Sequence, residues 1–155
     1  MFIVPGIPAT QIQGAYNHPP EEERAVYRIE RKQYGFRLVF GDAIEVPEMA
    51  RWVEESKKAL AGVTGKFGVL VDMRNLKPLK PEAQAVMVEG QKAYKQQGME
   101  RSAVAVPNAV IALQFKRLAQ ESGIYQWERY IDASVRPEWE KIAEAWIVGA
   151  KDPDK

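Results

Sequence analysis

The sequence contains no cysteine, a single histidine and no excess of charge of either sign. Without cysteine the chain forms neither disulfides nor thiolate metal sites, which fits a reducing cytosol. Its 22 basic residues balance 21 acidic ones, for a formal net charge of +1. This balance predicts no nucleic-acid partner and no attraction to an anionic membrane.

Long hydrophobic runs are also missing. No apolar stretch approaches the roughly 20 residues that span a bilayer, so no stable membrane insertion is expected. Residues 1–11 have no basic residue before their short apolar piece, which Pro5 and Pro8 interrupt. Because this composition is atypical of a signal peptide, we expect a cytoplasmic protein.

The chain carries no signature of catalysis or of metal binding. Neither G-x-S-x-G nor H-E-x-x-H occurs, and His18 has no partner nearby in the sequence for a zinc site or a Ser-His-Asp relay. The segment 62–67 has the wrong spacing for a phosphate-binding loop and carries Phe67 where that motif needs a hydroxyl. We therefore expect a protein that is not an enzyme and holds no metal or cofactor.

The most informative stretch is KFGVLVDMRNLKPLKP, residues 66–81. The apolar run Phe67–Val71 is typical of a strand buried on both faces, as in a parallel sheet covered by helices. The run ends at Asp72, and residues 72–77 are predicted to form a polar loop at the carboxyl end of this strand. A helix is predicted to begin at Pro81.

Strands and helices alternate along the rest of the chain. The patterns predict a β-hairpin at 25–31 and 36–40, strands at 102–106 and 127–131, and helices at 47–61, 81–97, 108–121 and from 137. This order predicts an α/β fold with four helices, an N-terminal β-hairpin and a mostly parallel five-stranded sheet built from right-handed βαβ units. We expect a single domain at 25–149, an irregular arm at 1–24 and a frayed tail at 150–155.

Polar residues follow the predicted strands at their carboxyl ends, where open α/β sheets bind ligands. These residues are Asp72, Arg74 and Asn75 after the central strand, Asn108 after the next, and Asp132 and Ser134 after the last. They could form a cleft for a polar ligand. Alternatively, Asp72 pairs with Arg74 and Asn108 only caps its helix.

Large aromatic residues lie on the apolar faces of the predicted helices. Their default role is to fill the core, and the alternative is an interior that admits an apolar ligand. The residues that would line such a pocket are Trp52, Phe115, Trp139 and Trp146. In helix 108–121, Val110 and Leu113 lie off the main apolar row, so this second row is either buried or a partner-binding face.

Several segments, in the right order, resemble the SpoIIAA-like STAS domain family. They are GVLVDMRNLKP at 68–78, RSAVAV at 101–106, LAQESG at 118–123, WERYIDAS at 127–134 and AEAWI at 143–147. The resemblance covers about residues 25–147. It implies a right-handed βα superhelix, related in fold to CRAL-TRIO lipid carriers, and a binding module that is not an enzyme.

One departure from the family concerns regulation. STAS domains of the anti-sigma-antagonist type are phosphorylated on a Ser or Thr at the start of the helix after the central strand. This chain has neither residue between Val71 and Val88, so that switch cannot operate there.

The leading hypothesis is a regulatory module that acts through protein–protein contact, with a homodimer as a further expectation. The expected docking surface is Asp72–Lys77 with the adjoining helix 81–97, where Arg74 and Lys77 supply charged contacts and Met73 and Leu76 apolar anchors. The alternative is a small apolar-ligand or lipid-binding protein of CRAL-TRIO type, with the aromatic pocket named above.

Overall fold

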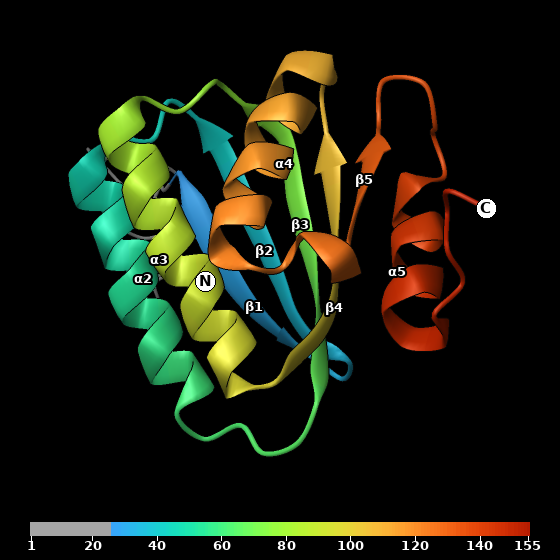
Figure 1. Ribbon diagram of the computed structural model, residues 1–155, viewed down its shortest axis with the longest axis horizontal. Coiled ribbons are helices and arrows are strands. Elements are labelled where there is room, and N and C mark those ends of the chain that lie inside the picture. Colours follow the sequence, from blue (N-terminus) through green and yellow to red (C-terminus); the bar gives the residue numbers. More distant parts are fainter. Residues whose placement is uncertain (1–25) are drawn as a thin grey trace, which may run out of the picture.

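The computed structural model describes residues 26–155 (Figure 1), so the predicted arm at 1–24, with His18, lies outside the described residues. The strands are β1 (Tyr27–Lys32), β2 (Gly35–Asp42), β3 (Phe67–Leu76), β4 (Met99–Val106) and β5 (Glu128–Asp132). The helices are α2 (Val46–Leu60), α3 (Pro81–Gln97), α4 (Ala109–Ser122) and α5 (Trp139–Gly149), with a short 3-10 helix, η1 (Tyr125–Trp127), before β5.

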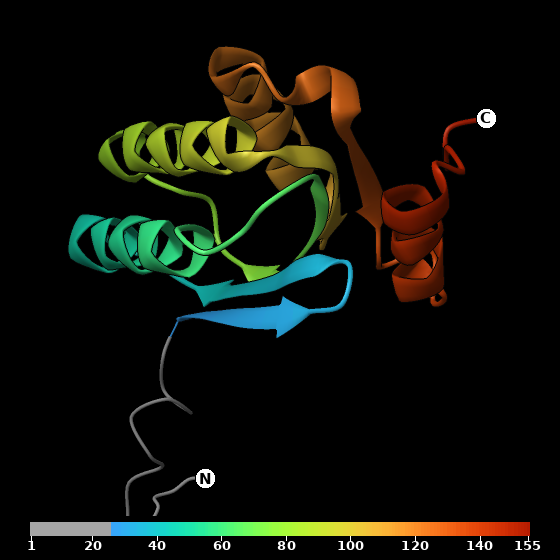
Figure 2. The same cartoon turned by 90° about the horizontal axis from the view of Figure 1, so that it is seen from below.

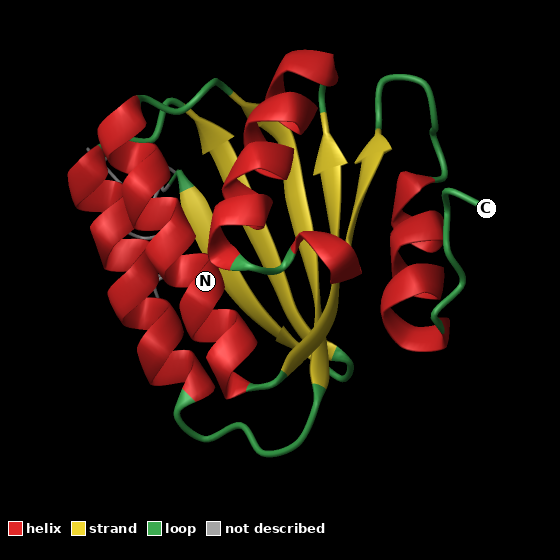
Figure 3. Ribbon diagram, in the orientation of Figure 1, coloured by secondary structure: helices red, strands yellow, loops and turns green. Residues whose placement is uncertain are grey.

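The five strands form one sheet in the order β1-β2-β3-β4-β5 (Figure 3). β1 and β2 form an antiparallel hairpin, and every later pair is parallel. The predicted α/β class, the N-terminal hairpin, the mostly parallel sheet and the central position of β3 are therefore confirmed.

The turn of the hairpin depends on Gly35. Its φ is +148°, in the region that favours glycine, and it pairs with Gly68 of β3. A Cβ at Gly35 would lie 2.0 Å from the carbonyl oxygen of Gly68. Glycine thus lets the chain turn out of β1 and approach the backbone of the central strand closely.

Helices cover the two faces of the sheet unequally. The helices α2, α3 and α4 lie on one face and α5 lies on the other, against β3, β4 and β5 (Figure 2). The first face carries the larger core, which includes Phe36, Phe40, Trp52 and Phe115. The smaller core under α5 includes Leu70, Ile131, Trp139 and Trp146. Beyond α5, the β1–β2 part of the second face bears charged side chains instead.

The sequence prediction was wrong about where β3 ends. The strand continues to Leu76, because its carboxyl end pairs with β2 beyond an irregularity near Phe40, and Lys77 N–H donates to Asp42 O over 3.1 Å. Both faces are buried up to Val71. From Asp72 onward Met73 points into the larger core, while Asp72 and Arg74 point to the polar part of the second face. Because polar residues are interspersed with apolar ones here, the segment does not match the pattern of a strand buried on both faces, and the sequence pattern predicted a loop.

The C-terminal tail, expected to be frayed, is held against β5 by an ion pair. Arg129 of β5 donates from Nε to Oδ1 of Asp152 over 2.9 Å and from Nη2 to Oδ2 over 3.0 Å. This two-pronged contact is the geometry in which arginine binds a carboxylate most specifically. The tail is therefore attached beside the β5 edge of the sheet.

Candidate functional site

The predicted site at the end of β3 is built around Asp72. Its carboxylate accepts hydrogen bonds from the Arg74 side chain, Nε to Oδ1 and Nη2 to Oδ2, both over 2.9 Å. The backbone N–H of Arg74 adds a third over 3.1 Å. Burial acts to raise the pKa of Asp72, but the hydrogen bonds and charge of Arg74, with the charge of Arg37, outweigh it and hold the pKa below its usual value. Asp72 is therefore ionised and fully engaged.

The surrounding charges extend this pair into a network on the second face of the sheet. Arg37 of β2 lies 3.5 Å from Asp72, 3.5 Å from Glu30 of β1 and 3.4 Å from Glu140 of α5. The Arg74 guanidinium lies 4.6 Å from the ring centre of Trp139. Each charge in the network has an opposite charge beside it, so the network ties α5 to β2 and β3.

Residues 72–77 do not form the exposed loop that we expected. Met73 and Leu76 are only 2% and 4% exposed, because both point into the larger core, so neither can anchor a partner. Arg74, Asn75 and Lys77 are exposed. The predicted docking surface thus loses its apolar anchors and keeps only its polar residues.

The other polar residues at the ends of the strands make local contacts. Asn108 caps α4, since its Oδ1 accepts from Ile111 N–H over 3.0 Å. Asp132 accepts from the backbone N–H of Ser134 over 2.9 Å and from its hydroxyl over 2.5 Å. These bonds do not join the Asp72 network, so the structure does not bring the predicted residues together in one cleft.

The four aromatic residues proposed to line one pocket lie on opposite faces of the sheet. Trp52 and Phe115 belong to the core under α2, α3 and α4, whereas Trp139 and Trp146 belong to the core under α5. The prediction of a single pocket lined by all four was therefore wrong. Residue spacing places a side chain on one face of its helix but does not say which face of the sheet that helix covers.

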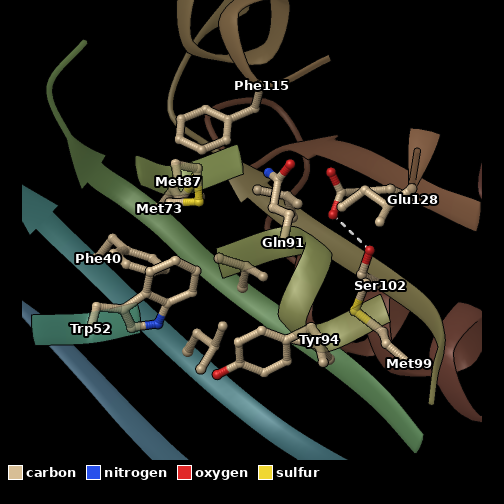
Figure 4. A pocket seen from close by; sticks show the side chains of 15 residues that line it. Phe40, Trp52, Met73, Met87, Gln91, Tyr94, Met99, Ser102, Phe115 and Glu128 are labelled. Atoms are coloured by element: carbon tan, nitrogen blue, oxygen red, sulfur yellow. Dashed lines mark hydrogen bonds between the residues drawn. The ribbon is translucent and has the colours of Figure 1, made fainter. Parts of the chain in front are cut away.

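An interior cavity of about 30 Å³ lies within the larger core (Figure 4). Trp52, Phe40 and Tyr94 surround one end of it, and Ser102 and Glu128 face each other at the other end. The indole nitrogen of Trp52 has no hydrogen-bond partner within the described residues. A neighbouring depression of about 40 Å³ shares Met99, Ser102 and Ile124 with the cavity. The cavity has about the size of one water molecule.

Glu128 is a buried acid that the sequence analysis did not single out. It accepts hydrogen bonds from the hydroxyls of Ser102 and Tyr130, each over 2.6 Å. Burial raises the pKa of Glu128, and these two hydrogen bonds only partly oppose the shift. The available signal was the alternation in residues 127–131. It places Glu128 and Tyr130 on the face opposite Ile131, and both faces of this strand are covered.

An exposed apolar row lies on the outer side of α4. Val110 and Leu113 are 63% and 67% exposed, so the second row of this helix is not buried. The loop after β3 is tied to α4 at the same level. Leu79 N–H donates to Gln114 Oε1 over 2.9 Å, and Gln114 Nε2 donates to Leu79 O over 3.1 Å. We call Lys77, Pro78, Val110 and Leu113, all exposed, the α4 rim surface.

Within residues 26–155, no cluster of three or more histidine, aspartate or glutamate side chains has the arrangement of a metal site. None of the helices in this range combines the length and the hydropathy needed to cross a bilayer. No protein-family model and no curated protein matches the chain.

Proposed function

We propose that this chain is a STAS-like regulatory module, with the right-handed βα superhelix of that family, and that it acts by binding a protein partner without catalysis. The observation that carries the proposal is the exposed apolar row Val110 and Leu113, which lies at the end of the sheet where the strands have their carboxyl ends. Absence of cysteine fits a reducing compartment, and we propose the cytoplasm.

The α4 rim surface replaces the docking surface expected from the sequence. Val110 and Leu113 supply the apolar anchors that Met73 and Leu76, being buried, cannot supply. Arg117, one turn after Leu113, pairs with Glu121 over 2.9 Å and places charged groups beside the row. An interface core of apolar anchors with charged groups at its rim is the usual composition of protein–protein contacts.

The charge beside the row indicates the kind of partner. Lys77 is exposed next to the loop that Gln114 holds against α4. A partner segment that fits would present two or more apolar side chains with a carboxylate near them. The lack of Ser and Thr between Val71 and Val88 means that binding here is not switched by phosphorylation of this segment.

Affinity purification from the native host tests the proposal. We compare the wild type with the variant Val110→Asp plus Leu113→Asp, which places two charges in the apolar row. Both residues are exposed, so the variant is expected to fold. The partner should co-purify with the wild type and be lost from the double variant.

Val148→Asp is the matched control, because Val148 is 64% exposed on a different helix, α5. The control should retain the partner. Identical sets of partners for the wild type and the double variant, with both proteins folded by circular dichroism, would contradict the proposal.

Lipid binding remains the alternative reading, but the geometry favours it less. The cavity of about 30 Å³ is far smaller than the roughly 300–1,000 Å³ of ordinary ligand pockets. A lipid would have to displace core side chains such as Met73 or Phe115. Native mass spectrometry of the protein from its own host decides this point, since a retained lipid would shift the mass.

A further inference from the structure

The outer edge of β1, on the side away from β2, presents a row of backbone N–H and C=O groups. Among residues 26–155, no strand pairs with this edge. Gly41 N–H donates to Val26 O over 2.8 Å, and antiparallel pairing continues to Lys32 opposite Gly35. Backbone groups alternate in direction along an antiparallel strand. The N–H and C=O groups of Tyr27, Ile29 and Arg31 therefore point outward, away from β2.

The side chains of β1 alternate in the same way. Tyr27 and Ile29 lie opposite Phe40 and Leu38 and share their face, under α2. Arg28 and Glu30 lie on the second face, where their side chains are 53% and 32% exposed and 3.3 Å apart. The face of β1 away from α2 thus carries Arg28 and Glu30, two residues apart, with Lys32 at the end of the strand.

We propose that two copies of this chain join through β1, antiparallel and centred on Ile29, to form one continuous sheet with five strands from each copy. In this register Ile29 lies opposite Ile29 of the second copy, and Tyr27 lies opposite Arg31. Only residues with outward backbone groups hydrogen-bond to each other, as an antiparallel ladder requires. About six main-chain hydrogen bonds would result from three such pairs.

Charge selects this register over its neighbours. Centred on Ile29, each Arg28 lies opposite Glu30 of the other copy, which gives two favourable cross-strand pairs. A two-fold axis at Arg28 would place the two arginines opposite each other, and an axis at Glu30 would do the same with the two glutamates. The register with opposite charges in contact is also the one that pairs the whole of 27–31.

The other edge of the sheet differs. There the tail is attached to β5 through Arg129 and Asp152, whereas β1 carries the half-buried Ile29 at an edge that no other described strand covers. Pairing with a second copy would satisfy the outward groups of an edge that otherwise invites uncontrolled association. Because a contact along one strand is small, the dimer is weak and depends on protein concentration.

Sedimentation velocity of the full chain tests the proposal with single charge reversals. In a dimer of Arg28→Glu, the glutamate at position 28 of each copy lies opposite Glu30 of the other. In a dimer of Glu30→Arg, the arginine at position 30 of each copy lies opposite Arg28 of the other. The association constant of each variant alone should be at least about tenfold lower than that of the wild type, because like charges lie opposite each other. An equimolar mixture of the two variants should dimerise again, since every cross-strand pair in the mixed dimer joins opposite charges.

The control is Lys32→Glu, a charge reversal on the same strand that faces Val26 rather than a charge. It should dimerise like the wild type, and circular dichroism should show that all variants are folded. A monomeric wild type at every concentration, single variants that dimerise normally, or a mixture that stays monomeric would each overturn the proposal.

Cysteine substitution tests the register independently, because the chain has no cysteine of its own. Only the residue on the two-fold axis lies opposite the same residue of the second copy. Ile29→Cys should therefore form a disulfide-linked dimer at least about tenfold faster than Arg28→Cys or Glu30→Cys. Equal rates for the three variants would overturn the register. Failure here leaves the α4 rim surface untouched, since that surface shares no residue with β1.

Discussion

The hydroxyl of Ser102 lies 2.6 Å from Oε2 of Glu128, which joins β4 to β5 through a buried carboxyl group. Tyr130 holds the other oxygen of the same carboxyl over 2.6 Å, and its hydroxyl is also 3.3 Å from Phe115 O. The Tyr130 hydroxyl can therefore donate to Phe115 O and accept a hydrogen bond from Glu128 when the carboxyl is protonated. The arrangement accommodates both charge states of the acid.

Glu128→Gln should stabilise the protein more at high pH than at low pH. Burial raises the folded-state pKa of Glu128 above its ordinary value of 4.5. The unfolded chain then loses its proton first, so stability present below pH 4.5 is lost as the pH rises toward the folded pKa. Thermal unfolding of both proteins between pH 4 and pH 8 should show a gap in Tm that widens with pH.

Glu138→Gln, at an exposed position before α5, provides the comparison for this experiment. Its gap in Tm from the wild type should stay nearly constant over the same range. If the gap for Glu128→Gln is also constant, the buried carboxyl does not titrate as described.

Gly90→Ala should destabilise the protein, although alanine normally favours a helix over glycine by about 1 kcal/mol. A Cβ at Gly90 in α3 would lie 2.1 Å from Cζ3 of Trp52, whose indole ring packs against this glycine. Forcing extra volume into a filled core costs about 1–3 kcal/mol, so the net effect is a loss. Urea unfolding measures the change in the free energy of unfolding.

Gly149→Ala is the control for that substitution, because no atom lies within 4 Å of a Cβ built at Gly149. It should be neutral or stabilising by up to about 1 kcal/mol. Equal effects at the two positions would show that Trp52 does not pack against Gly90.

Asn108→Ala should lower the free energy of unfolding by about 1 kcal/mol, because α4 loses the side-chain acceptor at its first turn. Asn108→Asp keeps an acceptor and should cost much less. The same urea experiment distinguishes the two. Partner binding should survive Asn108→Asp. If Asn108→Asp lowered the free energy of unfolding as much as Asn108→Ala, that result would argue against a capping role.

Arg129→Gln should raise the pKa of Asp152. The side chain of Arg129 is the main cause that holds this pKa at about 2, with the backbone N–H of Asp154 as the second. Removing the guanidinium should move the pKa toward the ordinary value of 3.8, which NMR titration of the carboxyl carbons measures. Arg51→Gln, on α2, should leave it unchanged. An unshifted Asp152 in Arg129→Gln would mean that the tail is not held by this contact.

The sequence predicted the element order well because each element carries a strong local pattern. The hairpin, the apolar run Phe67–Val71 and the cap at Asn108 all follow from residues next to one another in the chain. The end of β3 was missed because its last five residues mix polar and apolar side chains and do not continue the apolar run. Such a mixed segment becomes recognisable as a strand only when its pairing with β2 is known.

The site was harder to predict for the same reason. Met73 and Leu76 resembled exposed anchors, but their burial depends on helices far away in the sequence. Trp139 and Trp146 have the spacing of core residues, and only the tertiary fold shows that their core is not that of Trp52 and Phe115. The exposed row of α4 was visible as a surplus of apolar residues, but its exposure was not.

Site-specific photo-crosslinking in living cells tests the proposed docking surface most directly. A photoreactive phenylalanine analogue replaces Leu113 in one variant and Val148 in the other, both exposed positions on separate helices. The account predicts a crosslinked product of larger mass from position 113 and none from position 148. No product at position 113, or the same product at both positions, would contradict it.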